Sequence, residues 1–428
     1  MKKVLILTVG GSHEPIVKSL KEIKPDYIIF LCSDNSPAVK GSYTQITDKV
    51  EKKNRDCSTS FLANIPSQVN LKEETWEIVK IKYFDDLSSC YEISICTIKD
   101  IRERLVPEEI IVDYTGGTKS MSAGLAAAAL DDGNCKIVLV SGMRSDLEKV
   151  RNKTEYVKPV AYYDTLANKS MMQAASLVKR FDFSGAMDIL ELSIRLPLSN
   201  EKEEELKKNL DICRGFDAWD RFDHALAFQF LDPYRKYLVP YVITLEKIKK
   251  EMEGNSISYL LVEDLLLNAE RRSVQGRYED AIGRAYRAIE LTAQIRLRTK
   301  YRQDTGNITI EPLYSIGEEF RDKLERHRNN EDNKAQIGLM LSYELLAELR
   351  DPVIQPWLED NRNRIRNFLS YRNNSLFAHG FKAIDRDTYE REVPPIVETI
   401  RRLIKDLSTG EKRKAIEMRQ FPDRLPGE

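Results

Sequence analysis

The sequence has little of what zinc sites, disulfide frameworks and membrane spans require. Its 428 residues include six cysteines and four histidines, and no two cysteines form a C-x-x-C pair. We therefore expect no zinc site, and no disulfide framework in a chain long enough to bury a large core. No uninterrupted apolar run approaches the ~20 residues that a bilayer span needs. These absences favour a cytoplasmic protein that does not cross a membrane.

An excess of charge of one sign is also missing. Lys and Arg together number 67 and Asp and Glu 68, which gives a net charge of -1. This balance excludes a generally basic nucleic-acid coat, but it leaves room for a local basic groove. Residues 361–428 are locally basic, with three arginines at Arg362, Arg364 and Arg366. These arginines either contact the phosphates of a nucleic acid or form an ordinary solvated helix face.

The first 160 residues alternate strand patterns with helix patterns. Continuous apolar runs predict buried strands at Val4–Val9, Tyr27–Cys32, Glu109–Asp113 and Lys136–Ser141, with weaker strands at Trp76–Val79 and Lys80–Phe84. Small helix-forming residues follow the Glu109–Asp113 strand, at Ser120–Ala128. Strands that alternate with helices predict a parallel, doubly wound sheet.

From about Leu166 onward the sequence has a helical character. We therefore predict an α/β domain at residues 1–160 and an all-α region at 161–428. Two segments of the helical region resemble each other, Leu177–Leu190 and Ala269–Ile282, and form either a weak repeat of a helical hairpin or two ordinary helix corners. The charged segment Arg321–Ala335 is predicted to be largely an exposed loop. The tail from Ser408 is predicted to fray.

Two glycine-containing loops follow predicted strands. Gly10–Pro15 follows the strand Val4–Val9, and Asp113–Met121 follows the strand Glu109–Asp113. In open α/β sheets, ligands bind beyond the carboxyl ends of strands, where such loops gather. Lys119 adds a positive charge at the start of a predicted helix, whose free N–H groups suit an anion. The glycine spacing matches neither a nucleotide-binding P-loop nor a dinucleotide fingerprint. The loops therefore predict either a phosphate-rich ligand or a tight turn without one.

The segment VDYTGGTKSMSAGLAAAA and the first loop GSHEP resemble the ligand loops of CARF domains, the Rossmann-like sensors of CRISPR-associated proteins. The resemblance implies a pocket for a cyclic oligoadenylate, shared across a homodimer. By position it implies these ligand-binding residues: Gly10, Gly11, Ser12, His13, Asn35, Gly116, Gly117, Thr118, Lys119 and Ser120. Further candidates are Ser33 and Asp34 for the adenosine, and Met143 and Arg144 for the rim.

A second constellation lies near the C-terminus, in the segment YRNNSLFAHG. Arg372 and His379 are seven residues apart, which would place them on one face of a helix. A histidine can act as a general base or acid near neutral pH, and an arginine can stabilise phosphate oxygens. RNA supplies its own nucleophile, the 2′-OH, so this set would need no metal. The plain alternative is an exposed histidine near a helix end.

Arg372 is followed directly by Asn373, and six residues in all separate Arg372 from His379. This pattern resembles the R-x(4–6)-H signature of HEPN ribonucleases, with Asn directly after Arg. The stretch Leu261–Arg298 also resembles a HEPN-associated segment. Together the two halves resemble the CARF–HEPN ribonucleases of type III CRISPR systems. The resemblance implies a HEPN core at about 255–408, with Arg372, Asn373 and His379 as the catalytic residues.

This resemblance further implies a homodimer in which two Arg–His pairs form one composite site. It implies activation by cyclic tetra- or hexa-adenylate, cleavage of single-stranded RNA, 2′,3′-cyclic phosphate products, and no metal, cofactor or DNA. Two alternatives stay open, a non-enzymatic CARF sensor or regulator and a CARF pocket that degrades its own ligand. Arg284, Arg287 and Glu290 share a predicted helix face, which either borders the RNA cleft or carries an ordinary charge pair.

Overall fold

The structure is a computed structural model of the whole chain. It describes residues 3–37, 40–48, 50–53, 59–141, 156–253, 258–311, 313, 316–328, 334–410 and 418–426. The chain divides into two compact units, Met1–Leu166 and Ala167–Glu428, which are taken one at a time below. Among the described helices, none combines the length and the apolar character of a bilayer span.

The first unit is built on a sheet of six strands in the order β5-β2-β1-β6-β7-β8. The strands are β1 Lys3–Val9, β2 Tyr27–Ser33, β5 Trp76–Ile81, β6 Glu109–Asp113, β7 Lys136–Ser141 and β8 Tyr156–Pro159. The first five are parallel neighbours, as the alternating sequence pattern predicts. A separate antiparallel pair consists of β3 Val50–Lys53 and β4 Thr59–Leu62.

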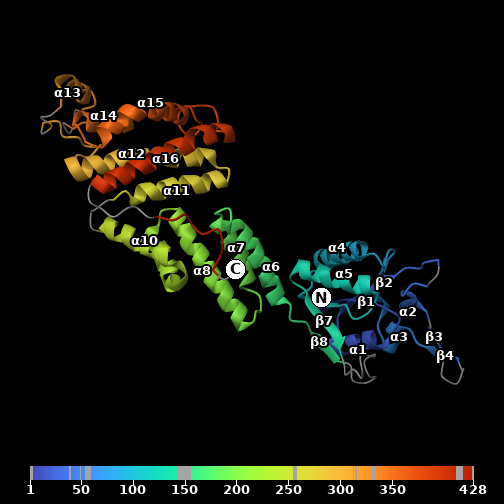
Figure 1. Cartoon of the computed structure of the whole chain (residues 1–428). Coiled ribbons are helices and arrows are strands. Elements are labelled where there is room, and N and C mark those ends of the chain that lie inside the picture. The colour runs from blue at the N-terminus through green and yellow to red at the C-terminus, as the bar shows by residue number, and fades with distance from the viewer. Residues whose placement is uncertain are drawn as a thin grey trace. The chain divides into compact units, whose positions relative to one another are not determined.

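Both faces of the sheet are buried, which explains why its strands are continuous apolar runs rather than alternating ones. Val4 and Ile6 of β1 pack on one side with the helices α4 (Leu87–Leu105) and α5 (Lys119–Asp132), whereas Leu5 and Leu7 pack on the other side with α1 (Glu14–Ile23). The helices of this unit are α1 Glu14–Ile23, α2 Thr44–Thr47, α3 Ile65–Gln68, η1 Glu73–Thr75, α4 Leu87–Leu105 and α5 Lys119–Asp132. Figure 1 shows α4 and α5 together on one face and α1 on the other.

Three details of the predicted sheet need correction. The two weak strands predicted between Trp76 and Phe84 are one strand, β5, which ends at Ile81. The sheet is not wholly parallel, because β8 runs antiparallel to β7 at its edge. The short pair β3–β4 had no clear sequence signal, since its strands are only four residues long.

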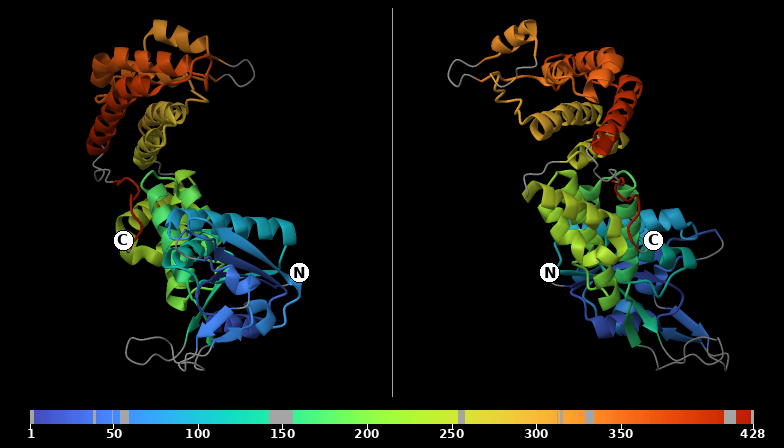
Figure 2. Two further views of the ribbon diagram at one scale, coloured as in Figure 1. Left: turned by 90° about the vertical axis from the view of Figure 1, so that its right-hand side faces the viewer. Right: turned by 60° about the vertical axis from the view of Figure 1, so that its left-hand side comes forward.

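The second unit is helical and has two cores. The first core is formed by α6 Tyr163–Val178, α7 Phe183–Ser193, α8 Asn200–Asp220, α9 His224–Leu231, η2 Asp232–Tyr234 and α10 Arg235–Glu253. Its centre is aromatic, with Phe216 stacked against Phe183 and Trp219. Phe421 packs into the same cluster, so the tail from Ser408, predicted to fray, is anchored over its described end. Figure 2 shows this red C-terminal segment beside the green helices.

The second core belongs to the helices that follow. They are α11 Leu260–Val274, α12 Tyr278–Tyr301, α13 Glu318–Glu325, α14 Leu339–Glu348, α15 Ile354–Asn373 and α16 Arg386–Gly410. They share one large apolar cluster, and Figure 1 shows α11, α12 and α16 side by side. The loop predicted at Arg321–Ala335 is only partly a loop. It begins inside α13, and Ala335 is buried and bonded through its backbone to Ile308.

A buried carboxylate fixes the start of α15. Asp351 is fully buried, and its Oδ2 accepts hydrogen bonds from Arg296 Nε at 2.8 Å and Tyr301 OH at 2.9 Å. Its Oδ1 accepts from the backbone N–H of Val353 at 3.1 Å and of Ile354 at 3.0 Å. Burial alone would raise the pKa of Asp351, but these bonds hold it below its ordinary value. The helix that carries Arg372 is therefore tied firmly to α12.

Candidate functional site

The two glycine loops of the first unit lie against each other. They follow β1 and β6, which are parallel neighbours, so both loops leave the sheet at the same edge. A Cβ on Gly10 would lie 2.7 Å from the backbone nitrogen of Gly117, and a Cβ on Gly116 would collide with the carbonyl oxygen of Thr8. Gly117 also has a φ of 84°, which favours glycine. These glycines allow the loops to pack closely.

Two hydroxyls in the predicted ligand motif hold the loop in place. Thr118 Oγ1 donates to the carbonyl of Phe84 at 2.6 Å and accepts from the N–H of Met121, which caps α5. Ser120 Oγ donates to the carbonyl of Asp85 at 2.8 Å. Since each hydroxyl has a single proton and that proton is engaged, these groups could meet a ligand only as acceptors.

Lys119, Gly11, Ser12 and Asn35 are the exposed members of the predicted set. Lys119 is the first residue of α5, a helix of 14 residues. Within the described part of the chain it has no ion pair, so its ammonium group is available to an anion. Together with the first N–H groups of α5, it gives this edge of the sheet a local positive character.

His13 and Asn35 lie close by but are engaged in the protein itself. His13 is 4% exposed, and its ring nitrogens contact the side-chain amides of Gln45 and Gln68. This arrangement leaves no ring nitrogen for a ligand, and it ties the first loop to α2 and α3. Asn35 is exposed, but its side chain donates to Tyr43 OH at 2.8 Å and accepts from the N–H of Gly41 at 2.9 Å.

Sequence reasoning missed one cation near these loops. Lys80 comes from β5, and its Nζ lies 3.6 Å from the centre of the Tyr43 ring and 3.7 Å from Asp34. The pairing of β5 with β2 brings Lys80 next to the loop after β2, which only the strand order reveals. The weaker candidate Ser33 bonds through its backbone and hydroxyl to Ser42. Met143 and Arg144 lie outside the described residues.

In the second unit, the predicted helical placement of His379 is wrong. Helix α15 ends at Asn373, and the chain turns back so that the N–H of His379 donates to the carbonyl of Asn373 at 3.2 Å. Gly380 makes the turn possible, because a Cβ there would collide with the carbonyl oxygen of Asn374. Two asparagines and a serine favour such an ending, since their side chains compete with helical hydrogen bonds.

The turn is a closed loop that presents His379 to solvent. The N–H of Gly380 donates to the Ser375 carbonyl at 3.0 Å, and the N–H of Leu376 donates to the Lys382 carbonyl at 3.1 Å. Ser375 is buried, whereas His379 is exposed. The described residues give its imidazole ring no hydrogen bond, so the ring nitrogens are open to solvent.

Arg372 stands in the last turn of α15, before this loop. Its guanidinium lies 4.3 Å from the centre of the Tyr286 ring, and its Nη1 donates to Asn373 Oδ1 at 3.1 Å. Stacking and this bond orient the guanidinium and leave most of its N–H groups open to phosphate oxygens. Arg372, Asn373 and the backbone of His379 are thus brought together by the end of one helix.

Three apolar side chains surround His379 in sequence and are exposed. Leu376, Phe377 and Phe381 are 54%, 70% and 99% exposed. Large apolar side chains gathered on one short loop are typical of a surface that another molecule covers.

The charged residues predicted near the cleft have partners within the chain. Arg287 pairs with Glu290 at 2.6 Å, beside Tyr286, and Arg284 pairs with Asp280 at 3.1 Å. The arginines that precede the motif are likewise engaged: Arg362 with Glu344 at 2.9 Å, Arg366 with Glu344 at 3.9 Å and Arg364 with Thr399 at 2.9 Å. These contacts fit the solvated helix face that the sequence left open.

Comparison with known proteins gives a domain match and a fold match. Residues 249–406 match the family described as the Csm6 HEPN domain. The structure is similar to Csm6 from Enterococcus italicus, solved bound to cyclic hexa-2′-fluoro-hexa-dAMP, with a TM-score of 0.57 and 12% identity over 95% of this chain and 94% of that one. No curated protein matches the sequence.

Two other solved structures are similar over smaller parts of the chain. Can2 from Sulfobacillus thermosulfidooxidans, in complex with cyclic tetra-adenylate, has a TM-score of 0.24 and 11% identity over 54% of this chain and 68% of that one. Protein VC1899 from Vibrio cholerae has a TM-score of 0.25 and 12% identity over 67% of this chain and 68% of that one. Scores this low carry no argument about the fold.

The domain match covers α11 to α15 and most of α16, and so includes Arg372 and His379. The fold match extends over nearly the whole chain, including the sheet unit. Residues 249–406 therefore match a Csm6-type HEPN domain, and the fold of nearly the whole chain is similar to that of a solved Csm6.

Proposed function

We propose that this protein is an endoribonuclease that cyclic oligoadenylate activates and that cleaves single-stranded RNA without a metal. The observation that carries the proposal is the end of α15, where Arg372 is oriented by Tyr286 and Asn373, and the exposed His379 is bonded through its backbone to Asn373, within the residues that match a Csm6 HEPN domain. Tyr286 and Asn373 hold the guanidinium of Arg372, and the closed loop 374–382 presents His379. Such a pair suits phosphodiester cleavage.

The reaction follows from these groups. A His379 ring nitrogen removes the proton of the RNA 2′-OH, and the oxygen attacks the adjacent phosphorus. The P–O5′ bond breaks, and a protonated histidine returns a proton to the leaving oxygen. Arg372 stabilises the charge that develops on the non-bridging oxygens. The products are a 2′,3′-cyclic phosphate and a 5′-hydroxyl.

A second copy of the chain would supply what one chain has only once. A base and an acid are both needed, and each chain has a single histidine in the motif. The exposed Leu376, Phe377 and Phe381 support a covered surface at this loop. A two-fold interface here would face one His379 toward its copy and bury the apolar side chains.

The ligand would bind at the paired loops of the sheet unit. Lys119 and the N-terminus of α5 suit its phosphates, and the glycine contacts hold the loops in register. The solved Csm6 of similar fold carries a cyclic hexanucleotide analogue, which supports a ligand of this class. For activation, the ligand must bind the active arrangement of the dimer more tightly than the inactive one.

The direct test is cleavage of a fluorogenic single-stranded RNA in the presence of EDTA, with cyclic tetra- and hexa-adenylate added separately. We expect cleavage to rise strongly with one ring size, and the RNA fragments to carry 2′,3′-cyclic phosphates. Cleavage that requires Mg²⁺, or no cleavage with any ring, would contradict the proposal. Binding of a ring without any cleavage would instead favour the non-enzymatic sensor.

A further inference from the structure

Three helix corners in the second unit share one pattern. Each corner has a residue with positive φ followed by the N-cap residue of the next helix: Phe181 and Asp182, Phe222 and Asp223, Gly276 and Arg277. The first and third corners are the two segments that resemble each other in sequence, and the second, with the letters RFD, repeats the first. The corners therefore place three helix N-termini, those of α7, α9 and α12, in equivalent local settings.

The third corner departs from the other two at the helix start. Asp182 accepts a hydrogen bond from the N–H of Gly185, and Asp223 accepts one from the N–H of Leu226, both at 3.0 Å. Arg277 holds the same position before α12 and makes no capping bond. A helix of 24 residues thus begins with a cation where its neighbours begin with a carboxylate. This replacement leaves the first N–H groups of α12 without the capping carboxylate that α7 and α9 have, and the acidic residues of this helix, Glu279 and Asp280, stand inside its first turn instead.

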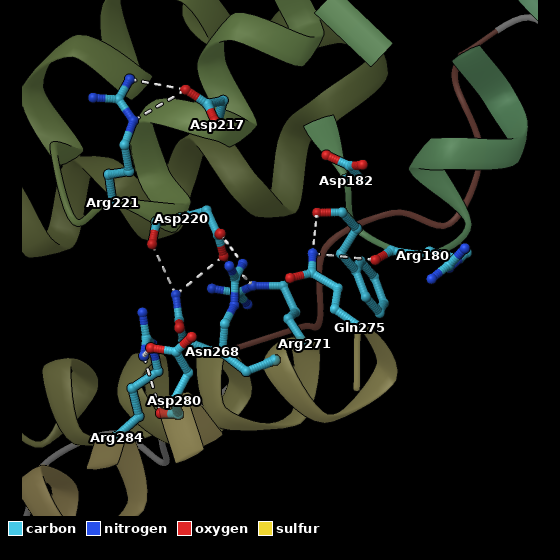
Figure 3. A network of polar contacts seen from close by, with 12 residues as sticks. Arg180, Asp182, Asp217, Asp220, Arg221, Asn268, Arg271, Gln275, Asp280 and Arg284 are labelled. Carbon is cyan, nitrogen blue, oxygen red and sulfur yellow. Dashed lines mark hydrogen bonds and ion pairs between the residues drawn. The ribbon is translucent and has the colours of Figure 1, made fainter. Parts of the chain in front are cut away.

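A cavity of about 390 Å³ lies between these corners, and each corner contributes arginine to its lining. The four lining arginines are Arg180, Arg221, Arg272 and Arg277. Gln275 joins the first and third corners, because its side-chain nitrogen donates to the carbonyls of Phe181 at 2.9 Å and Arg180 at 3.3 Å. Figure 3 shows Gln275 reaching toward the corner that carries Arg180 and Asp182. The cavity is larger than one phosphate needs and falls in the range of small-molecule sites.

The acidic residues of the cavity are already engaged. Asp217 pairs with Arg221 at 2.9 Å, Asp220 binds Arg271 at 2.8 Å and also Arg272, and Asp182 caps α7. Figure 3 shows Asp217 and Arg221 as one such pair. Arg180 and Arg277 are exposed and, within the described residues, have no ion pair. Two of the four arginines that line the cavity are therefore uncompensated.

A buried donor also lacks an acceptor at this place. Arg272 is 7% exposed, and its Nε has no hydrogen-bond partner among the residues that the structure describes, although the other end of its guanidinium binds Asp220. Burying an N–H group without an acceptor is costly, so a partner is expected from outside the chain. A cation would not serve, because a guanidinium N–H is a positively charged donor that needs an acceptor atom.

We propose that this cavity is a phosphate-binding site, in which Arg180, Arg277 and the Nε of Arg272 hold a phosphate group of a nucleotide or of an RNA strand. Planar guanidinium groups bind phosphate oxygens in pairs of hydrogen bonds. The N-terminus of α12 adds its free N–H groups. This site is distinct from the Arg372–His379 site and from the loops of the sheet unit, and it does not depend on the proposed activity.

Calorimetric titration of the full-length protein tests the proposal with three probes: pyrophosphate, ATP and a short 2′-O-methyl RNA, which lacks the attacking hydroxyl. The decisive variant is Arg277→Asp, which restores the cap that the other corners have. We expect it to weaken binding at least tenfold while leaving the melting temperature unchanged or higher. Arg180→Ala should weaken binding in the same direction.

Two matched controls separate this site from general charge effects. Arg195→Ala removes an exposed arginine of the same unit outside the cavity, and Lys119→Ala removes the cation of the sheet unit. Neither should change the part of the binding that Arg277→Asp abolishes. Binding of pyrophosphate and ATP alone would assign a free nucleotide, and binding of the RNA alone would assign a strand. Unchanged affinity in both Arg277→Asp and Arg180→Ala, or no binding of any probe at millimolar concentration, would overturn the proposal.

Discussion

The loop after β6 and the loop after α15 both depend on a glycine that packs closely against another part of the backbone, but they leave different side chains exposed. In both, a glycine sits where a Cβ would collide with a carbonyl oxygen, Gly116 against Thr8 and Gly380 against Asn374. In the first loop, the hydroxyls of Thr118 and Ser120 are bonded to the protein. In the second, backbone bonds close the loop and His379 protrudes.

The difference separates residues that build a site from residues that act in it. In the sheet unit, the hydroxyls of the predicted ligand motif hold the loop in place, and Lys119 is its exposed charge. In the helical unit, Tyr286 and Asn373 orient Arg372, and backbone hydrogen bonds close the loop that carries His379. The imidazole of His379 and most of the N–H groups of Arg372 stay open to a substrate in the proposed reaction. Substitutions in the first loop should therefore change ligand affinity or stability, and substitutions in the second should change the rate of cleavage.

The largest effect is expected for His379→Ala. General acid–base groups contribute about 10²–10⁴-fold to a rate, and a dimer would lose both copies at once. Single-turnover cleavage of RNA should therefore fall at least a hundredfold, whereas ligand affinity measured by calorimetry stays as in the wild type. Retention of a tenth of the activity or more would remove His379 from the reaction.

Asp351→Asn should cost the most stability without touching either loop. The change leaves the buried guanidinium of Arg296 without its counter-charge, and breaking a buried ion pair costs about 3–5 kcal/mol. Denaturant unfolding of the second unit, followed by hydrogen exchange in α12 and α15, measures this loss. An equal loss in the helices of the sheet unit would contradict the assignment.

The same carboxylate predicts a pH dependence. The pKa of Asp351 is lower in the folded chain than its ordinary value of about 3.9. The stability that it contributes is therefore present above that ordinary value and is lost as the pH falls through it toward the folded pKa. The free energy of unfolding of the second unit should decline more steeply in acid for the wild type than for Asp351→Asn. Parallel pH profiles would show that Asp351 is not the cause.

Gly380→Ala tests the closed loop against a matched change in the same unit. The added Cβ would displace the Asn374 carbonyl, so we expect cleavage to fall about tenfold and stability to fall by about 1–3 kcal/mol. Gly283→Ala is the control, because this exposed glycine of α12 has open space around it. That change should stabilise the helix by about 0.5–1 kcal/mol and leave cleavage intact. Similar effects of the two changes would refute the account of the loop.

The smallest contrast is inside the sheet-unit loop. Lys119→Ala should weaken cyclic oligoadenylate binding about tenfold with little change in melting temperature, because its ammonium group is exposed. Ser120→Ala removes the bond to the Asp85 carbonyl and should cost about 0.5–1.5 kcal/mol of stability. If Ser120→Ala weakened binding more than Lys119→Ala did, the division between building and binding residues would be wrong.

The sequence predicted the elements with strong local patterns and missed what depends on long-range contacts. The bounds of β6 and β7 are those expected, because a doubly buried strand is a continuous apolar run. The helical placement of His379 failed, since residue spacing cannot show that Gly380 folds back on Asn374. The role of His13 was equally hidden, because Gln45 and Gln68 reach it from distant parts of the chain.

The most direct test of the account is a mixing experiment on the catalytic loop. Arg372→Ala and His379→Ala chains are inactive alone in this account, and mixing them under conditions that allow exchange produces dimers with one intact arginine and one intact histidine on different chains. With cyclic oligoadenylate present, we predict RNA cleavage clearly above that of either variant alone. Cleavage by the mixture that stays at the level of the two variants, together with full activity from a wild-type monomer, would contradict a site shared between two chains.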